Sequence, residues 1–286
     1  MKSNSIIMGL LLAATGFTEL NARSFGEALK RKEIKYEVVS VPGPRRMLLR
    51  IKNLLKREAR IDVEPGRFFY NAAAVQPFVV SRPIALEMGP GEEREVAVRA
   101  YCGNATAACP STNQDFTRTE LGPENLCATL QMMAKNQIVG EGLYQQVIWF
   151  YSNKHQIASI FSGDADENSI QLVRQFICKK EDLKLPQYHI KYAQASSGDE
   201  LEFSGRPDEV FGKLNIKVEQ RSDLQVRVLD ASGNQIQLLQ VHLNQPTGEF
   251  EFPVLVRVAD YPLGSYTIAV SDERGNVLSS MPVVVS

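Results

Sequence analysis

The amino-acid sequence predicts a mainly β protein with a central α segment, built as two immunoglobulin-like β-sandwiches joined by a helical insert. Two long regions alternate apolar and polar residues, as half-buried strands do, and glycine and proline turns interrupt them. Between these regions, apolar residues recur at helical spacing instead. A chain of 286 residues is long enough for two domains, each with its own core.

Four segments follow from these patterns, in chain order. They are a signal peptide over 1–22, an N-terminal β-sandwich over 23–120, a helical segment over 121–185 and a C-terminal β-sandwich over 186–286. In the first, Lys2 precedes an apolar run too short to span a bilayer, and Leu20-Asn21-Ala22 is a plausible cleavage site. We therefore expect a cleaved signal, a periplasmic or extracellular location, and no transmembrane span.

The overall charge favours no class of charged partner. The formal net charge is -1, from 32 basic and 33 acidic residues. This balance argues against nucleic acid as a partner and gives no general attraction to anionic membranes. Function must then lie in local sites, and the expected partner is an unidentified protein or glycan on a cell surface.

Four cysteines, Cys102, Cys109, Cys127 and Cys178, lie in the middle of the chain, and an exported location allows them to form disulfides. Three connectivities are possible. Cys102 and Cys109 could pair across a loop of small residues, which would leave Cys127 for Cys178. Zinc sites need tighter paired spacing, and the histidines are scattered, so we expect no metal and no cofactor.

The N-terminal region begins with a polar and basic connector over Ser24 to Lys32, and alternating strands run from Glu33 to Cys102. A basic cluster here fits either a patch for an anionic polysaccharide or, as we favour, the solvated face of a strand. It comprises Arg45, Arg46, Arg50, Lys52, Lys56, Arg57 and Arg60. Three aromatic residues suggest a carbohydrate-binding accessory module, if exposed: Phe68, Phe69 and Tyr70.

The central segment opens a helix at Pro123-Glu124-Asn125, and Gly140 and Gly142 interrupt it. The following run, Leu143 to Tyr151, holds the only tryptophan, Trp149, as a core anchor. Periodicity alone leaves helix or strand open for Val147 to Tyr151. We predict a buried helix, because Asn153 offers a C-terminal stop.

A turn before the last predicted helix partly matches a calcium-binding loop. Asp164, Asp166 and Asn168 occupy its first three ligand positions, but Ser169 replaces the required glycine and Gln175 the bidentate glutamate. An N-cap with acidic residues that complement the helix dipole explains these residues better.

The C-terminal region alternates strongly, and two of its turns share the form Asp-x-x-Gly-Asn, beginning at Asp230 and Asp272. In each we expect Asp to cap a hairpin turn and Gly to take a positive φ. This last third resembles the β-sandwich modules of secreted Bacteroidetes proteins, including sorting domains of the type IX route. The chain end, Met281 to Ser286, lacks the basic residue of the sorting pattern, which favours a structural or binding module.

A sharper pattern lies in Tyr144-Gln145-Gln146-Val147-Ile148-Trp149 together with Tyr101-Cys102. These segments resemble the two motifs of bacterial thioester adhesin domains, except that Val147 stands where alanine is usual. The resemblance implies a bond between the Cys102 thiol and the Gln145 side chain, an acyl electrophile for a host nucleophile. The alternatives are a Cys102–Cys109 disulfide and a purely structural role for Gln145.

Known enzyme signatures are absent from the sequence: it contains no Gly-x-Ser-x-Gly elbow, no phosphate-binding glycine loop and no dinucleotide fingerprint. We therefore predict no catalytic residues, and a non-enzymatic, exported protein that serves binding, adhesion or assembly. A covalent adhesin using Cys102 and Gln145, and a carbohydrate-binding module, are the alternatives.

Overall fold

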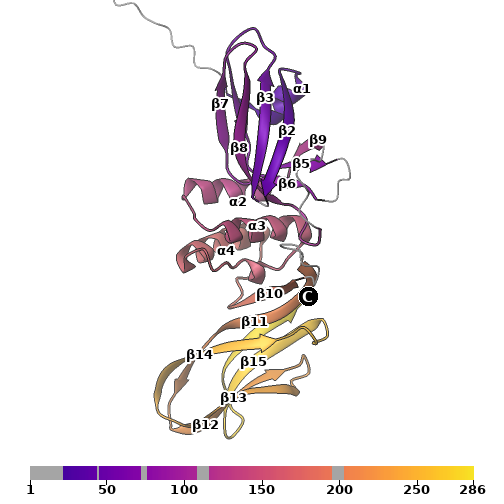
Figure 1. Cartoon of the computed structure of the whole chain (residues 1–286). Coiled ribbons are helices and arrows are strands. Elements are labelled where there is room, and N and C mark those ends of the chain that lie inside the picture. Colours follow the sequence, from indigo (N-terminus) through magenta and orange to yellow (C-terminus); the bar gives the residue numbers. More distant parts are fainter. Residues whose placement is uncertain (1–21, 44, 72–75, 108–115, 195–202) are drawn as a thin grey trace, which may run out of the picture.

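The computed structural model describes residues 22–43, 45–71, 76–107, 116–194 and 203–286. Strands in several sheets form most of the regular structure, and three longer helices lie between the two β-rich ends (Figure 1). This arrangement confirms the predicted fold class. The predicted signal peptide, apart from its last residue, and Cys109 lie outside the described residues.

The N-terminal strands form two sheets whose inner faces share one apolar cluster. One sheet has the order β1-β4-β7 and the other the order β2-β3-β8-β6-β5-β9. The strands are β1 (Arg23–Ser24), β2 (Ile34–Gly43), β3 (Arg46–Asn53), β4 (Ala59–Val63), β5 (Arg67–Asn71), β6 (Phe78–Val80), β7 (Ile84–Met88), β8 (Glu93–Cys102) and β9 (Phe116–Leu121).

Two parts of this region differ from the sequence prediction. The polar connector contains a short strand, β1, and a helix, α1 (Phe25–Lys30), in which Phe25 and Ala28 are fully buried and Ser24 caps the first turn. The stretch from Cys102 to Gly122 is rich in Gly, Asn, Thr, Pro and Ser, a composition that predicts a loop, but it contains β9, which pairs with β5. Both elements have few apolar residues, and tertiary packing decides their structure.

The helices follow β9 and lie between the two β-rich ends (Figure 1). They are α2 (Glu124–Lys135), α3 (Glu141–Asn153), the 3₁₀ turn η1 (Ile157–Ser159) and α4 (Glu167–Glu181). The run Val147 to Tyr151 is helical, as predicted, and α3 ends at Asn153. None of the helices in the described ranges is both long and apolar enough to cross a membrane.

The C-terminal strands again form two sheets around one apolar cluster, with the orders β10-β11-β14 and β13-β12-β15-β16. The strands are β10 (Tyr188–Gln194), β11 (Phe203–Val218), β12 (Ser222–Leu229), β13 (Gln235–Gln245), β14 (Gly248–Arg257), β15 (Gly264–Asp272) and β16 (Val277–Val285).

Both Asp-x-x-Gly-Asn hairpin turns form as predicted. The Asp230 carboxylate accepts hydrogen bonds from the backbone N–H groups of Ser232 and Asn234, each at 2.8 Å. Asp272 does the same at the second turn. Gly233 has a φ of 84°, a left-handed conformation that favours glycine because it has no Cβ.

Candidate functional site

The end of β8 and the inner face of α3 meet at the two residues that the sequence singled out. The Gln145 Nε2 donates a hydrogen bond to the Cys102 carbonyl at 2.8 Å, and both residues are buried. One residue earlier in each segment, the rings of Tyr101 and Tyr144 stack with their centroids 6.0 Å apart. The fold therefore brings together both halves of the predicted motif, although Cys102 and Gln145 are 43 positions apart in the sequence.

Side-chain amides also hold the loop that follows Cys102. Gln76 donates to the carbonyls of Asn104 and Ala107 at 2.7 and 2.6 Å, and accepts from the Asn104 N–H at 2.7 Å. From the end of α3, Asn153 donates to the Gly103 carbonyl at 3.0 Å and accepts from the Ala105 N–H. These bonds fix the backbone at Cys102, and the Gln145 contact fits the same pattern.

Behind this contact, Trp149 is 1% exposed, as expected of a core anchor. Its ring lies 5.9 Å from the ring of His155, which stacks on Tyr192 at 4.3 Å. Burial lowers the pKa of His155 to about 4, so this imidazole is neutral at pH 7. The stack connects the end of α3 to β10.

The predicted pairing of Cys127 with Cys178 is not present, because both residues are free thiols. Cys127 lies on α2 against Gly66, and Cys178 lies on α4. Burial raises the pKa of both thiols, which keeps them protonated at neutral pH. Sequence spacing could not show this, since pairing depends on how the two helices lie.

The aromatic residues proposed for carbohydrate stacking are not exposed as that alternative requires. Phe69 is fully buried and Phe68 is 7% exposed. Tyr70 is half-buried, and its hydroxyl donates to Glu120 at 2.5 Å. These three rings therefore offer no flat platform to a sugar.

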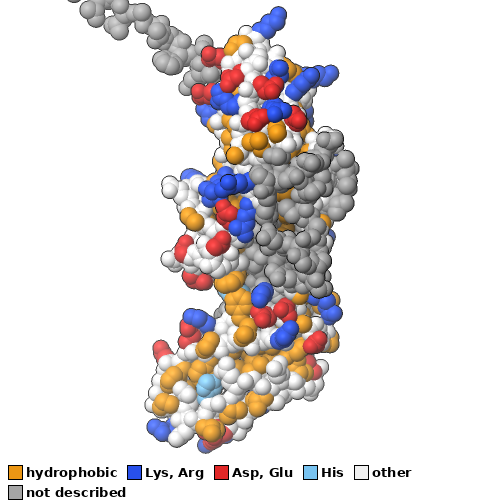
Figure 2. Space-filling model, viewed as in Figure 1, with side chains coloured by type: hydrophobic (Ala, Val, Ile, Leu, Met, Phe, Trp, Pro, Cys, Tyr) orange, Lys and Arg blue, Asp and Glu red, His pale blue; other side chains and the backbone are white. Residues whose placement is uncertain are grey.

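Several of the charged residues singled out in the sequence have local partners, among them Arg50, Asp164 and Asp166. Arg50 of the basic cluster donates to Glu37 at 2.8 Å, and Figure 2 shows basic and acidic side chains interspersed over the N-terminal strands. Asp166 is an N-cap, since it accepts from the Ser169 N–H at 2.9 Å, and Asp164 accepts from the Gly142 N–H at 3.0 Å. Within the described ranges, no three or more His, Cys, Asp or Glu residues are grouped to hold a metal ion.

A cavity of about 950 Å³ lies between α4 and the sheet that contains β10, β11 and β14. Sequence reasoning missed it, because its residues come from four separate parts of the chain. The one signal available was Arg174, a charged residue on the apolar face of α4, beside Val173 and Ile177.

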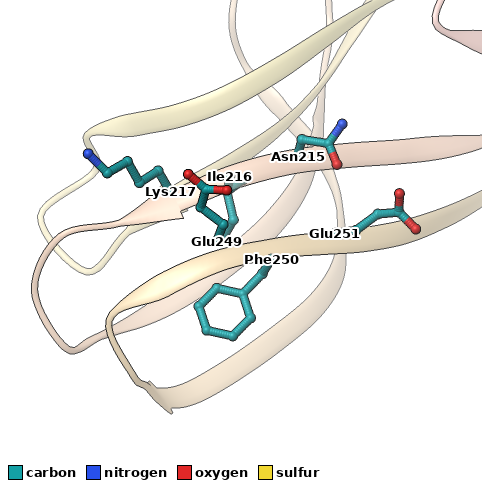
Figure 3. Close-up of a pocket in the computed structure, with 6 residues that line it drawn as sticks. All are labelled: Asn215, Ile216, Lys217, Glu249, Phe250 and Glu251. Carbon is teal, nitrogen blue, oxygen red and sulfur yellow. The ribbon is translucent and has the colours of Figure 1, made fainter.

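A second hollow is an open groove along β11 and β14 (Figure 3). Lys217 and Glu249 are directly opposite each other in the two strands, and Phe250 points to the other side (Figure 3). Opposite charges in register on a solvated sheet face are ordinary cross-strand pairs. The groove brings no set of reactive groups together.

Comparison with known proteins gives no family for this chain. No protein-family description matches it, and no curated protein matches it. Among solved structures, the crystal structure of red sea bream transglutaminase is similar over 91% of this chain and 33% of that chain, with 7% identity and a TM-score of 0.17. The chain thus spans a third of that protein, and so slight a likeness establishes neither fold nor activity.

Proposed function

We propose that this chain is an exported, non-enzymatic binding protein that acts in adhesion or assembly at a cell surface, and that it attaches covalently through an internal thioester. The observation that carries this proposal is the contact between Gln145 Nε2 and the Cys102 carbonyl, at 2.8 Å in a buried site. Stacking of Tyr101 on Tyr144 supports it, because it involves the aromatic residue of each motif half.

The bond would form by attack of the Cys102 thiolate on the side-chain carbonyl carbon of Gln145. A sulfur–carbon bond forms, the bond from that carbon to Nε2 breaks, and ammonia leaves with the thiol proton. No oxidant or cofactor is needed. An amine from a target protein would then displace the thiolate, which leaves an amide to the target and a restored Cys102 thiol.

Shelter from water would preserve the thioester until a target arrives. Gln145 is 5% exposed, and Trp149 lies one turn further along the same face of α3. Asn153 and Gln76 hold the loop after Cys102, which would limit drift of the thiol from the carboxamide. Such positioning is what an intramolecular reaction requires.

The test is the intact mass of the exported protein. We expect a loss of one ammonia from the wild type, and none from Cys102→Ser or Gln145→Ala. Incubation with methylamine should add one methylamine to the wild type only. Cys127→Ser is the matched control and should behave as the wild type does. A wild-type mass equal to that calculated without loss of ammonia would rule out the thioester.

Non-covalent binding is the second candidate, and exposed apolar side chains in the C-terminal region favour it. Leu243, Leu255 and Leu263 are 73%, 63% and 64% exposed, and Figure 2 shows apolar side chains over much of this end. Exposed apolar surface of this kind is typical of sites that contact another protein. Adhesion to a target that survives in the Cys102→Ser variant would favour this candidate.

A further inference from the structure

The cavity between α4 and the C-terminal sheet has the size of a small-molecule site. Its volume of about 950 Å³ lies in the range that such sites occupy, roughly 300–1,000 Å³. Phe161 precedes α4, Arg174 lies on α4, His189 on β10 and Phe211 on β11, so the cavity joins the helical segment to the C-terminal strands. None of its residues takes part in the Cys102 and Gln145 contact.

Arg174 is the buried polar group of this cavity, only 3% exposed. Its Nη2 donates to the carbonyls of Pro186 and Tyr188 at 2.7 and 3.1 Å, which fixes the guanidinium in place. Its Nη1 lies 3.4 and 3.5 Å from the two ring nitrogens of His189. Its Nε is buried without an acceptor among the described residues, so hydrogen-bonding capacity remains.

Arg174 makes no ion pair within 4.0 Å in the described part of the chain; burial lowers its pKa, and the Glu167 carboxylate on the same helix only partly offsets this from a distance. Two other charged residues line the cavity, Lys213 and Glu167. Lys213 is already paired with Glu251 at 2.8 Å, and Glu167 makes no ion pair among the described residues. Burial and the neighbouring Arg174 lower the pKa of His189 to about 4, so His189 adds no charge at pH 7.

A buried charge is costly unless a counter-charge accompanies it. The cavity therefore has one guanidinium that an anion would stabilise. Hydrogen bonds between a guanidinium and a carboxylate are charge-assisted and roughly twice as strong as those between neutral groups.

The walls of the cavity are apolar and aromatic. The rings of Phe161 and Phe211 lie 5.0 Å apart, edge to face, and His189 is stacked on Phe211 at 5.2 Å. Leu185, Pro186 and Val254 complete the apolar lining. Such walls accept a ring or branched hydrocarbon and reject a small hydrophilic ion.

We propose that this cavity binds an organic carboxylate, with its acid group at Arg174 and its apolar, ring-bearing body against Phe161 and Phe211. The cavity recognises its ligand by two features, an acid and an apolar ring. A small aromatic acid and the C-terminus of a peptide that ends in an aromatic residue share this chemistry. The site is separate from the thioester proposal and does not depend on it.

Titration calorimetry of the full mature chain tests the proposal with matched pairs of probes. One pair is 1-naphthylacetate and its neutral amide, and the other is a tetrapeptide ending in Phe with a free or an amidated C-terminus. We expect at least one acid to bind about tenfold more tightly than its amide. Binding of the small acid indicates a metabolite-like ligand, and binding of the peptide acid alone indicates a chain terminus.

Variants separate the two features of the site. Arg174→Gln should remove the preference for the acid, whereas Phe211→Ala, which keeps the guanidinium, should weaken acid and amide together. Lys213→Gln is the control for general electrostatic attraction and should change the preference little. Equal binding of acid and amide, binding unaffected by Arg174→Gln, or no binding of any probe at millimolar concentration would overturn the proposal.

Discussion

At the scale of single residues, burial of polar groups governs both stability and the site. His155 is 7% exposed, stacks on Tyr192, and its Nδ1 has no hydrogen-bond partner among the described residues. Burial lowers its pKa to about 4, from 6.5 in an unfolded chain. The unfolded chain therefore binds a proton more readily than the folded chain, and acid favours unfolding.

The sign of this linkage gives a prediction for His155→Phe, which keeps an aromatic ring but cannot be protonated. The wild type should have its full stability above about pH 7 and lose about 2 kcal/mol of it through His155 between pH 7 and pH 5. The free energy of unfolding of the variant, measured in urea at both pH values, should therefore fall by about 2 kcal/mol less than that of the wild type. Tyr192→Phe, which retains His155, should keep the wild-type pH dependence. Equal pH dependence in His155→Phe would contradict the assignment.

At the scale of elements, local patterns predicted the structure wherever the pattern is strong. Alternation identified the C-terminal strands, and Asp230 and Gly233 identified a hairpin turn, because these features depend on neighbours in sequence. Helix α1 was missed, since Phe25 and Ala28 are too few to reveal a buried face within a charged stretch. Contacts between elements that are distant in the sequence could not be predicted from local patterns. The contact between Cys102 and Gln145 is an exception, because the resemblance to a known motif pair suggested it.

One such contact joins the turn before β5 to α2 at Gly66. This residue has a φ of 83°, and a Cβ here would lie 2.6 Å from the Cys127 Sγ and 3.2 Å from its Cα. Gly66→Ala should therefore combine backbone strain with a steric clash and cost about 3 kcal/mol of stability. Gly91 is the matched control, because its φ is 67° and nothing lies within 4 Å of a Cβ there.

Urea unfolding of the two alanine variants measures the difference. Gly91→Ala should cost only the backbone strain, about 1 kcal/mol. The double variant Gly66→Ala with Cys127→Ala should recover part of the loss, because it removes the sulfur atom. If Gly66→Ala and Gly91→Ala lost the same unfolding free energy, α2 would have to move away from the new methyl group at little energetic cost.

At the scale of the whole molecule, the apolar clusters reveal which segments depend on each other. The cluster of the C-terminal strands draws all its buried members from Tyr188 to Val285, apart from Ala158. The cluster around the helices, by contrast, includes Phe68, Val79 and Tyr101 from the N-terminal strands. The sequence suggested a separate helical segment because periodicity changes there, but periodicity does not show which surface covers a helix.

This difference predicts how fragments of the chain behave. The fragment 186–286 should fold alone, with a strand-type circular dichroism spectrum and a cooperative urea transition, because it retains nearly all of its core. The fragment 121–185 should not fold, since it lacks the strand residues that cover its helices. The fragment 23–185 contains both parts and should regain helical signal and cooperativity.

If 121–185 folded alone, or if 186–286 required the helices, the dependence inferred from the apolar clusters would be wrong. The fragment 186–286 should unfold at a lower urea concentration than the same strands in the full chain, because it loses the hydrogen bonds that the buried Arg174 donates to the carbonyls of Pro186 and Tyr188.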